Sequence, residues 1–305
     1  MIRTEGLTKF YASRCVVNGV SFSIADREIV GFLGLNGAGK TTSLRMLAGL
    51  LTPSSGRIEI DGRDLLDDPL SMQWRIGFLP EPPPLYDDMR VSSYLEFAAR
   101  LKGLDVETSR RRLAEVIDLC DLREVSDEAI QTLSHGFKQR VGIAQAIVHD
   151  PDFVILDEPI NGLDPVQIVE MRTLIRKLKE KHTVLISSHI LGEISQTCDR
   201  VLIMHRGRVE HEQELAKPQG GGRIRLVVRG EAQALETAVR SVPAVESTKV
   251  VSSSDGVIDL EVRMTTDQSE ALAKAIVGAG LGLKRLEDEK SQLEQTFLKL
   301  TGANV

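Results

Sequence analysis

The sequence contains few cysteines, and their positions exclude the sites that cysteines usually build. Cys15, Cys120 and Cys198 lie far apart and match neither the spacing of a zinc site nor that of a redox pair. An odd, scattered set of cysteines is typical of proteins in a reducing cytoplasm, where disulfides are rare. The cysteines therefore favour a cytoplasmic protein.

Long hydrophobic runs are also missing. No stretch approaches the roughly 20 apolar residues that a membrane-spanning helix needs. The first residues, MIRTEGLTKFY, lack the apolar core of a signal peptide. We therefore expect any role at a membrane to come through a partner chain, with this protein held peripherally on the inner face of the cell membrane.

An excess of positive charge is absent as well. The formal net charge is −6 at pH 7, and neither half of the chain is basic. Because nucleic-acid-binding proteins usually carry a basic face, the charge balance predicts no nucleic-acid partner. The chain has 305 residues, of which 42% are hydrophobic, so it is long enough for one large domain or two ordinary ones.

Up to about residue 210, short apolar strands alternate with longer helical segments. EIVGFLG (28–34), FVILDEP (153–159) and TVLISSH (183–189) are typical of strands, and the last two of buried parallel strands. Residues 91–131 instead carry apolar side chains at three- and four-residue spacing, which indicates helices. This alternation predicts an α/β fold with a parallel sheet.

A second domain is expected after the stretch AKPQGGGR (216–223), where a proline and three glycines interrupt all periodicity. We therefore predict a first domain over 1–215, a linker over 216–223 and a C-terminal domain over 224–305. The expected elements of the C-terminal domain are a strand (224–229), a helix (231–241), two strands (244–252 and 257–263), a helix (267–279) and a strand (281–287). This order is that of a ferredoxin-like α+β fold, and SQLEQTFLKLTG then closes the chain as a short amphipathic helix.

The segment GLNGAGKT (34–41) fits the phosphate-binding motif G-x-x-x-x-G-K-[ST], with an expected strand before it and a helix after it. Glycines allow consecutive backbone N–H groups to converge on phosphate oxygens at a helix N-terminus. Asn36, Gly37 and Gly39 are therefore expected to form a cradle for phosphate.

The residues that follow these glycines supply the charge and the metal ligand. Lys40 would reach the β- and γ-phosphates, and the Thr41 hydroxyl would ligate Mg²⁺. Thr42 would add a donor to the α-phosphate. The motif therefore predicts a site for a nucleoside triphosphate and Mg²⁺.

Two carboxylates end the strand FVILDEP, and a histidine ends the strand VLISSH. Asp157 would hold Mg²⁺ through water, while Glu158 points to the other side and can polarise an attacking water. His189 would contact the γ-phosphate and orient that water. Taken singly, the carboxylates could instead cap a helix, and His189 could be an ordinary polar residue at a strand end.

Five motifs resemble those of the ABC-transporter ATPase family, and they follow one another along the chain in the order that the family has. GLNGAGKT matches its Walker A loop, FVILDE its Walker B strand, NGLDP (161–165) its D-loop and His189 its switch histidine, while LSHGFKQR (133–140) stands where its LSGGQ signature belongs. The resemblance covers about residues 1–210. It implies a P-loop NTPase core with an antiparallel β subdomain and an α-helical subdomain at about 91–140.

The resemblance also assigns residues to the binding of ATP by two chains. Two copies would face head to tail, so that each ATP lies between one P-loop and the signature of the partner. Ser134, which should cap the signature helix, and Gly136 would then meet the partner's γ-phosphate, and Asp164 would touch the partner. Tyr11 stands where the family places an aromatic that stacks on adenine, although an edge aromatic covering the core is the ordinary alternative.

The sequence departs from the family in two places. Glu81, in the "LPE" loop, replaces a glutamine, as in many relatives that pair with ABC-2-type permeases; it could ligate Mg²⁺ or orient water, although its charge would repel the γ-phosphate unless the metal screens it. Pro82–Pro84 stiffen the next segment and form either a surface for a permease's coupling helix or simply a rigid loop. His135 and Phe137 replace a glycine and a glutamine of the signature, and both are expected to point away from the phosphate.

The expected function is ATP hydrolysis that drives a separate ABC-2-type permease, in an exporter. A non-transport ABC ATPase is disfavoured because no long heptad array lies between Lys40 and Asp157 and only one ATPase unit exists. An ATP-gated scaffolding or regulatory module is disfavoured by the complete set of catalytic residues, and an importer by the C-terminal domain and the "LPE" loop. Relatives serve drug, sodium, polysaccharide or lipid export, copper-enzyme maturation and gliding motility, and the PLYDDM loop most resembles the gliding-motility group.

Overall fold

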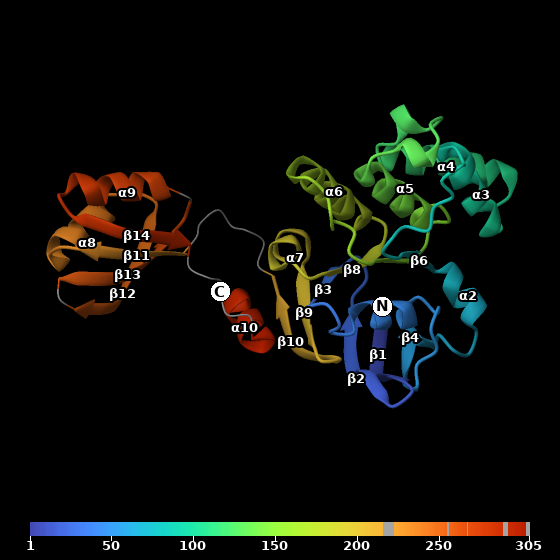
Figure 1. The fold of residues 1–305 in the computed structure, drawn as a ribbon, viewed down its shortest axis with the longest axis horizontal. Helices are drawn as coiled ribbons and strands as arrows, with labels where there is room; N and C mark the ends of the chain where they lie inside the picture. The colour runs from blue at the N-terminus through green and yellow to red at the C-terminus, as the bar shows by residue number, and fades with distance from the viewer. Residues whose placement is uncertain (216–222, 255, 267, 289–291, 303–305) are drawn as a thin grey trace. The chain divides into compact units, whose positions relative to one another are not determined.

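The computed structural model describes residues 1–215, 223–254, 256–266, 268–288 and 292–302. Contacts divide the chain into two compact units (Figure 1), Met1–Leu215 with Lys299–Val305 and Ala216–Leu298. Residues 216–222 of the predicted linker lie outside the described residues, and Arg223 begins the first strand of the second unit.

A six-stranded sheet forms the centre of the first unit. Its order is β10 (Arg208–Glu214), β9 (Arg200–His205), β3 (Ile29–Leu33), β8 (Thr183–Ser188), β7 (Phe153–Leu156) and β6 (Ile76–Leu79). The strands from β9 to β6 are parallel, and β10 pairs antiparallel at the edge. Every residue of β3, β7 and β8 is buried, which explains their near-continuous apolar sequences. The predicted α/β fold with a parallel sheet is confirmed.

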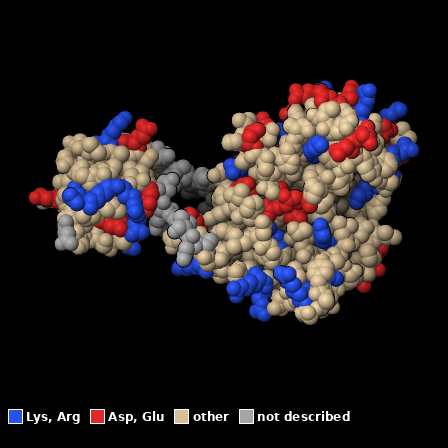
Figure 2. Space-filling view, viewed as in Figure 1, with Lys and Arg blue, Asp and Glu red and all other residues tan. Residues whose placement is uncertain are grey.

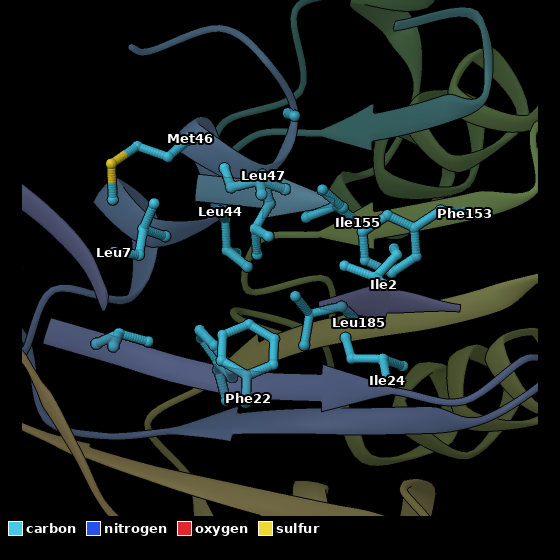
Figure 3. Packing of buried hydrophobic residues seen from close by; sticks show 14 of the residues in the cluster. Ile2, Leu7, Phe22, Ile24, Leu44, Met46, Leu47, Phe153, Ile155 and Leu185 are labelled. Carbon is cyan, nitrogen blue, oxygen red and sulfur yellow. The ribbon is translucent and has the colours of Figure 1, made fainter. Parts of the chain in front are cut away.

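A second, antiparallel sheet packs against the first through a shared apolar core. Its order is β2 (Arg14–Ile24), β1 (Ile2–Tyr11), β4 (Ser55–Ile60) and β5 (Arg63–Asp64). Phe22 of β2 meets Phe32 of β3 edge-on, with ring centroids 5.2 Å apart. Figure 3 shows Leu44 and Leu47 of helix α1 (Lys40–Leu47) in the same cluster. The helix that follows the P-loop is therefore anchored where the two sheets meet.

Helices of the first unit fall into a group beside the sheet edge and a group along the sheet. The first group contains α3 (Val91–Leu101), α4 (Val106–Leu119) and α5 (His135–Ile147), with two 3₁₀ turns, Arg123–Val125 and Ile130–Thr132. The second contains α6 (Pro165–Leu178) and α7 (Leu191–Thr197), while the short helix α2 (Pro69–Trp74) lies beside β6. Buried Arg112 of α4 donates to the carbonyls of Ile147 and Val148, so it caps the end of α5. The α-helical region expected at about 91–140 is present.

The second unit contains the predicted succession of elements. These are β11 (Arg223–Arg229), α8 (Ala232–Arg240), β12 (Val245–Ser254), β13 (Val257–Met264), α9 (Ser269–Gly278) and β14 (Gly282–Asp288). The sheet order is β12-β13-β11-β14, with all neighbours antiparallel. Alternate residues of β11 and β13 are buried with apolar side chains of α8 and α9, so the unit has its own core.

The closing helix is α10 (Gln292–Thr301). Among the described residues, no helix has both the length and the apolar character to cross a membrane.

His149, just after α5, gives the fold a pH-dependent stability. Its Nε2 donates to the carbonyl of Ile76 over 3.2 Å, and its Nδ1 is buried without a partner. Burial, and then the nearby Lys102 charge, lower the pKa of His149 to about 4. Between about pH 6.5 and pH 4, His149 therefore binds a proton in the unfolded chain but not in the folded chain.

We expect the free energy of unfolding to fall by ~2 kcal/mol from this residue between pH 7 and pH 4.5. His149→Gln keeps a donor for Ile76 but cannot titrate. Between pH 7 and pH 4.5, its free energy of unfolding should therefore fall by ~2 kcal/mol less than that of the wild type. Urea unfolding of both proteins at the two pH values measures the difference. Equal losses in the wild type and the variant would contradict this account.

Candidate functional site

The predicted phosphate loop runs from the end of β3 into α1, and its backbone requires glycine. Gly37 and Gly39 have φ angles of 81° and 105°, in the left-handed region. A Cβ atom at Gly39 would lie 2.8 Å from the carbonyl oxygen of Val16, and one at Gly34 would lie 2.5 Å from that of Met204. The loop is therefore held closely against β2 and β9, and a larger residue would displace it.

An open cavity of about 270 Å³ lies on this loop. It is lined by the predicted residues Asn36, Gly37, Gly39, Lys40, Thr41, Thr42, Glu81 and Glu158, and also by Arg14, Val16, Leu35 and Ala38. Backbone N–H groups at a helix N-terminus favour an anion here. The structure thus brings the P-loop residues and two predicted carboxylates to one cavity.

Lys40 is buried and joins the P-loop to Glu158, which follows strand β7. Its Nζ donates to the carbonyl of Gly34 over 2.6 Å and lies 3.2 Å from Glu158 Oε1. The Nδ1 of His189 donates to Glu158 Oε2 over 2.9 Å. Lys40, Glu158 and His189 therefore form one chain of contacts, in which both oxygens of the carboxylate are engaged.

Asp157 presents one oxygen without a partner. Its Oδ1 accepts from the Ser187 hydroxyl over 2.6 Å, and its Oδ2 is buried with no hydrogen bond. Burial raises the pKa of Asp157, and the charges of Glu158 and Glu81 add to this shift, whereas the neighbouring Ser187 and Thr41 hydroxyls oppose it. A cation beside Oδ2 would satisfy this atom and favour the charged form.

The residues here fit Mg²⁺, which prefers a few protein oxygens together with phosphate and water. Thr41 and Asp157 could hold it, as predicted. Among the described residues, no group of three or more His, Cys, Asp and Glu side chains could hold a metal by itself. A metal at this place would therefore take its other ligands from the nucleotide and from water.

The signature segment begins helix α5 as predicted. The Ser134 hydroxyl accepts from the N–H of Phe137 over 3.3 Å, so Ser134 caps the helix. Gly136 is buried, and a Cβ atom there would lie 2.8 Å from the Gln167 side chain of α6. The predicted cap is therefore present, and the glycine allows two helices to approach closely.

His135 is turned toward the loop that contains the predicted D-loop. Its Nε2 donates to the Asn161 carbonyl over 3.1 Å, and the Asn161 side chain donates to Glu81 Oε1 over 2.7 Å. Asp164 of the same loop caps α6, because its Oδ1 accepts from Val166 and Gln167. Asn161 thus connects Glu81 with His135, two of the positions at which the sequence departs from the family pattern.

Tyr11 ends β1 and is not among the residues that line the cavity. Tyr11 is 47% exposed, and the Lys9 ammonium lies 5.7 Å from the centroid of its ring. Across the hairpin, Tyr11 pairs with Arg14, which does line the cavity. The sequence reasoning missed Arg14, because the turn at Ala12 and Ser13 contains none of the Gly, Asn or Asp residues that mark hairpins.

The comparisons with known proteins agree with this arrangement. The family model described as "ABC transporter" matches residues 17–161, which include the P-loop, the signature and the carboxylate pair. The ABC transporter ATP-binding protein YxlF of Bacillus subtilis is 36% identical over 303 residues, which cover 99% of this chain and 100% of that protein. The chain belongs to the ABC transporter ATP-binding protein family.

Two further relatives add detail to this assignment. The bacitracin transport ATP-binding protein BcrA of Bacillus licheniformis is 42% identical over 70% of this chain and 69% of its own length. The dimeric ABC transporter cassette MJ0796 is similar in structure, with a TM-score of 0.65 and 26% identity over 71% of this chain and 99% of that one. MJ0796 has also been solved as a dimer in a post-hydrolysis state, bound to ADP and Pi.

Proposed function

We propose that this chain is the ATP-hydrolysing subunit of an ABC exporter, which dimerises around two ATP molecules and drives a separate ABC-2-type permease. The observation that carries the proposal is the contact chain of Lys40, Glu158 and His189 beside the phosphate cavity. With a phosphate in the cavity, Lys40 would supply a cation, Glu158 a base and His189 an orienting group.

An entering γ-phosphate would compete with Glu158 for the Lys40 ammonium. Once Lys40 turns to the phosphate, Glu158 Oε1 is free to accept a proton from the attacking water, which is general base catalysis. His189, already bonded to Oε2, would keep the carboxylate in place and contact the γ-phosphate. Mg²⁺ on Thr41 and Asp157 would neutralise the developing charge on the phosphates.

The remaining nucleotide contacts are proposed from the positions around the cavity. Asn36, Gly37, Gly39 and Thr42 would bind the phosphates through the P-loop. The exposed ring of Tyr11 would stack on adenine, a contact that is worth ~1–3 kcal/mol on nucleic-acid platforms.

Glu81 lines the cavity and is a candidate ligand of the metal, directly or through water.

Dimerisation would complete each site with residues of the second chain. Ser134 and Gly136 lie at the N-terminus of α5, where the helix dipole favours the γ-phosphate of the partner. Asp164 would lie at the contact between the two chains. The dimeric relative MJ0796 supports this proposal. ATP would then favour the closed dimer by binding it more tightly than the open form, and hydrolysis would release it.

A permease is proposed to dock on a groove beside the Glu81 loop. Two cavities of about 450 and 270 Å³ share Pro84, Lys102 and Gln145. Tyr86 and Phe97 are 54% and 38% exposed on the wall of the smaller cavity. Aromatic side chains of this kind are enriched in protein interfaces. The loop from Glu81 to Pro84 runs from the nucleotide cavity to this groove, so it could transmit the state of the site.

The direction and setting of transport rest on the relatives. BcrA is named for bacitracin transport, which supports a drug-exporting system. A non-transport ABC ATPase or an ATP-gated module are the alternatives. Figure 2 shows both acidic and basic side chains on the face that it presents. We propose no nucleic-acid partner, because the formal net charge is −6. The subunit would lie on the cytoplasmic side of the membrane through its permease.

The C-terminal unit is proposed to be a ferredoxin-like accessory domain over 224–305, beyond an ATPase domain over 1–215. Its sheet order, with the first strand between the third and the last, supports this assignment. The resemblance to ATPases of ABC-2-type systems points to regulation or dimer contact.

Glu158→Gln tests the proposed chemistry. The amide cannot accept the proton, so we expect turnover to fall by ~10²-fold or more while ATP still binds. The variant should form a stable ATP-dependent dimer, measured by size-exclusion chromatography with Mg²⁺ and ATP. Glu180→Gln, the same change at an exposed glutamate, is the matched control. Turnover at the wild-type rate in Glu158→Gln would contradict the assignment of Glu158 as the base.

Glu81→Gln tests coupling to the permease. It removes the charge beside the cavity while retaining an acceptor for Asn161. We expect the stimulation of hydrolysis by the permease in vesicles to change at least ~5-fold, which corresponds to a coupling free energy of ~1 kcal/mol. Should neither the basal nor the stimulated rate change, Glu81 has no such role.

A further inference from the structure

Ser187 is a fully buried polar residue at the centre of the site that no sequence motif selects. It lies next to the end of β8, between β3 with the P-loop and β7 with the two carboxylates. Its exposed fraction is 0%. Because Ile186 pairs with Leu156 in the parallel register, Ser187 stands beside Asp157. A buried hydroxyl at this place needs partners, since leaving it unpaired is unfavourable.

Both hydrogen-bonding functions of the hydroxyl go to the neighbouring carboxylate residues. Its hydrogen goes to Asp157, because Ser187 Oγ donates to Oδ1 over 2.6 Å. Its lone pair goes to Glu158, because Oγ accepts from the Glu158 N–H over 2.8 Å. One side chain therefore holds the carboxylate of Asp157 and the backbone of Glu158 at the same time.

Each contact has a separate consequence for the site. The bond to Oδ1 fixes the Asp157 carboxylate so that Oδ2 is the oxygen left without a partner. The bond from the Glu158 N–H holds that residue at a φ of 49°, a left-handed conformation that residues other than glycine seldom adopt. In this conformation the Glu158 side chain reaches Lys40 and His189.

We propose that Ser187 is a positioning residue for both carboxylates: it leaves one Asp157 oxygen for Mg²⁺ and holds Glu158 where it can act as the base. The inference deepens the proposed function and rests on it. Ser188, the next residue, serves the opposite side of the strand, because its hydroxyl accepts from the Ile190 N–H over 3.0 Å and contacts Glu193. The effect on the carboxylates is therefore specific to Ser187.

Ser187→Ala removes both hydrogen bonds and leaves the P-loop unchanged. We expect the Mg²⁺ concentration for half-maximal hydrolysis to rise about tenfold and kcat to fall about tenfold or more, since hydrogen bonds to charged groups are among the strong ones. ATP binding in EDTA, measured by calorimetry, should stay within about twofold of the wild type. The gain in ATP affinity on adding Mg²⁺ should shrink, a readout that needs no turnover.

Three further variants make the test specific. Ser187→Thr retains the hydroxyl and should recover most of the Mg²⁺ response, whereas Ser187→Cys has nearly the same shape but a weak donor and should behave like Ser187→Ala. Ser109→Ala removes another fully buried serine hydroxyl, far from the site in α4, and should leave the Mg²⁺ response unchanged. Thermal unfolding of all four variants reports any general loss of stability.

The proposal is overturned if Ser187→Ala shows the wild-type Mg²⁺ response and kcat, or if Ser109→Ala reproduces its defects. It is also overturned if Ser187→Cys matches the wild type. Failure of the proposed function would be seen in a different variant. If that function is wrong, Glu158→Gln, in which Ser187 is unchanged, would hydrolyse ATP at the wild-type rate.

Discussion

The buried ion pair between Lys40 and Glu158 is the interaction on which the rest of the site depends. Each residue exposes only 6% of its surface, and removing either partner would leave an uncompensated buried charge. The Gly34 carbonyl and His189 satisfy the other ends of the pair. In the proposed function, a phosphate that enters the cavity would offer Lys40 a second anion, so that nucleotide binding and release would switch Glu158 between a paired and a free state.

The parallel sheet explains why residues so distant in sequence meet at this pair. The strands β3, β7 and β8 run in one direction, so their carboxyl ends lie at the same edge of the sheet. This is the edge at which open α/β sheets bind their ligands. Asn161 then extends the site outward, because it contacts both Glu81 and His135. Two of the departures from the family pattern, Glu81 and His135, are thereby linked through one residue.

Much of the site could be predicted because its chemistry is local in sequence. The P-loop, the carboxylates after β7 and the Ser134 cap all follow from spacing and from the ends of predicted elements. The roles of Ser187 and Asn161 could not be predicted, because they depend on the strand register and on the left-handed backbone of Glu158. The position of Tyr11 outside the lining of the cavity could not be predicted either, since it depends on the geometry of one hairpin.

The most direct test of this account is a crystal structure of the protein with Mg²⁺ and a non-hydrolysable ATP analogue. The account requires the Lys40 ammonium to bind phosphate oxygens and to leave Glu158, while Asp157 Oδ2 faces the metal and Ser187 keeps its bond to Oδ1. A structure in which the nucleotide is bound and the Lys40–Glu158 pair remains closed would contradict it.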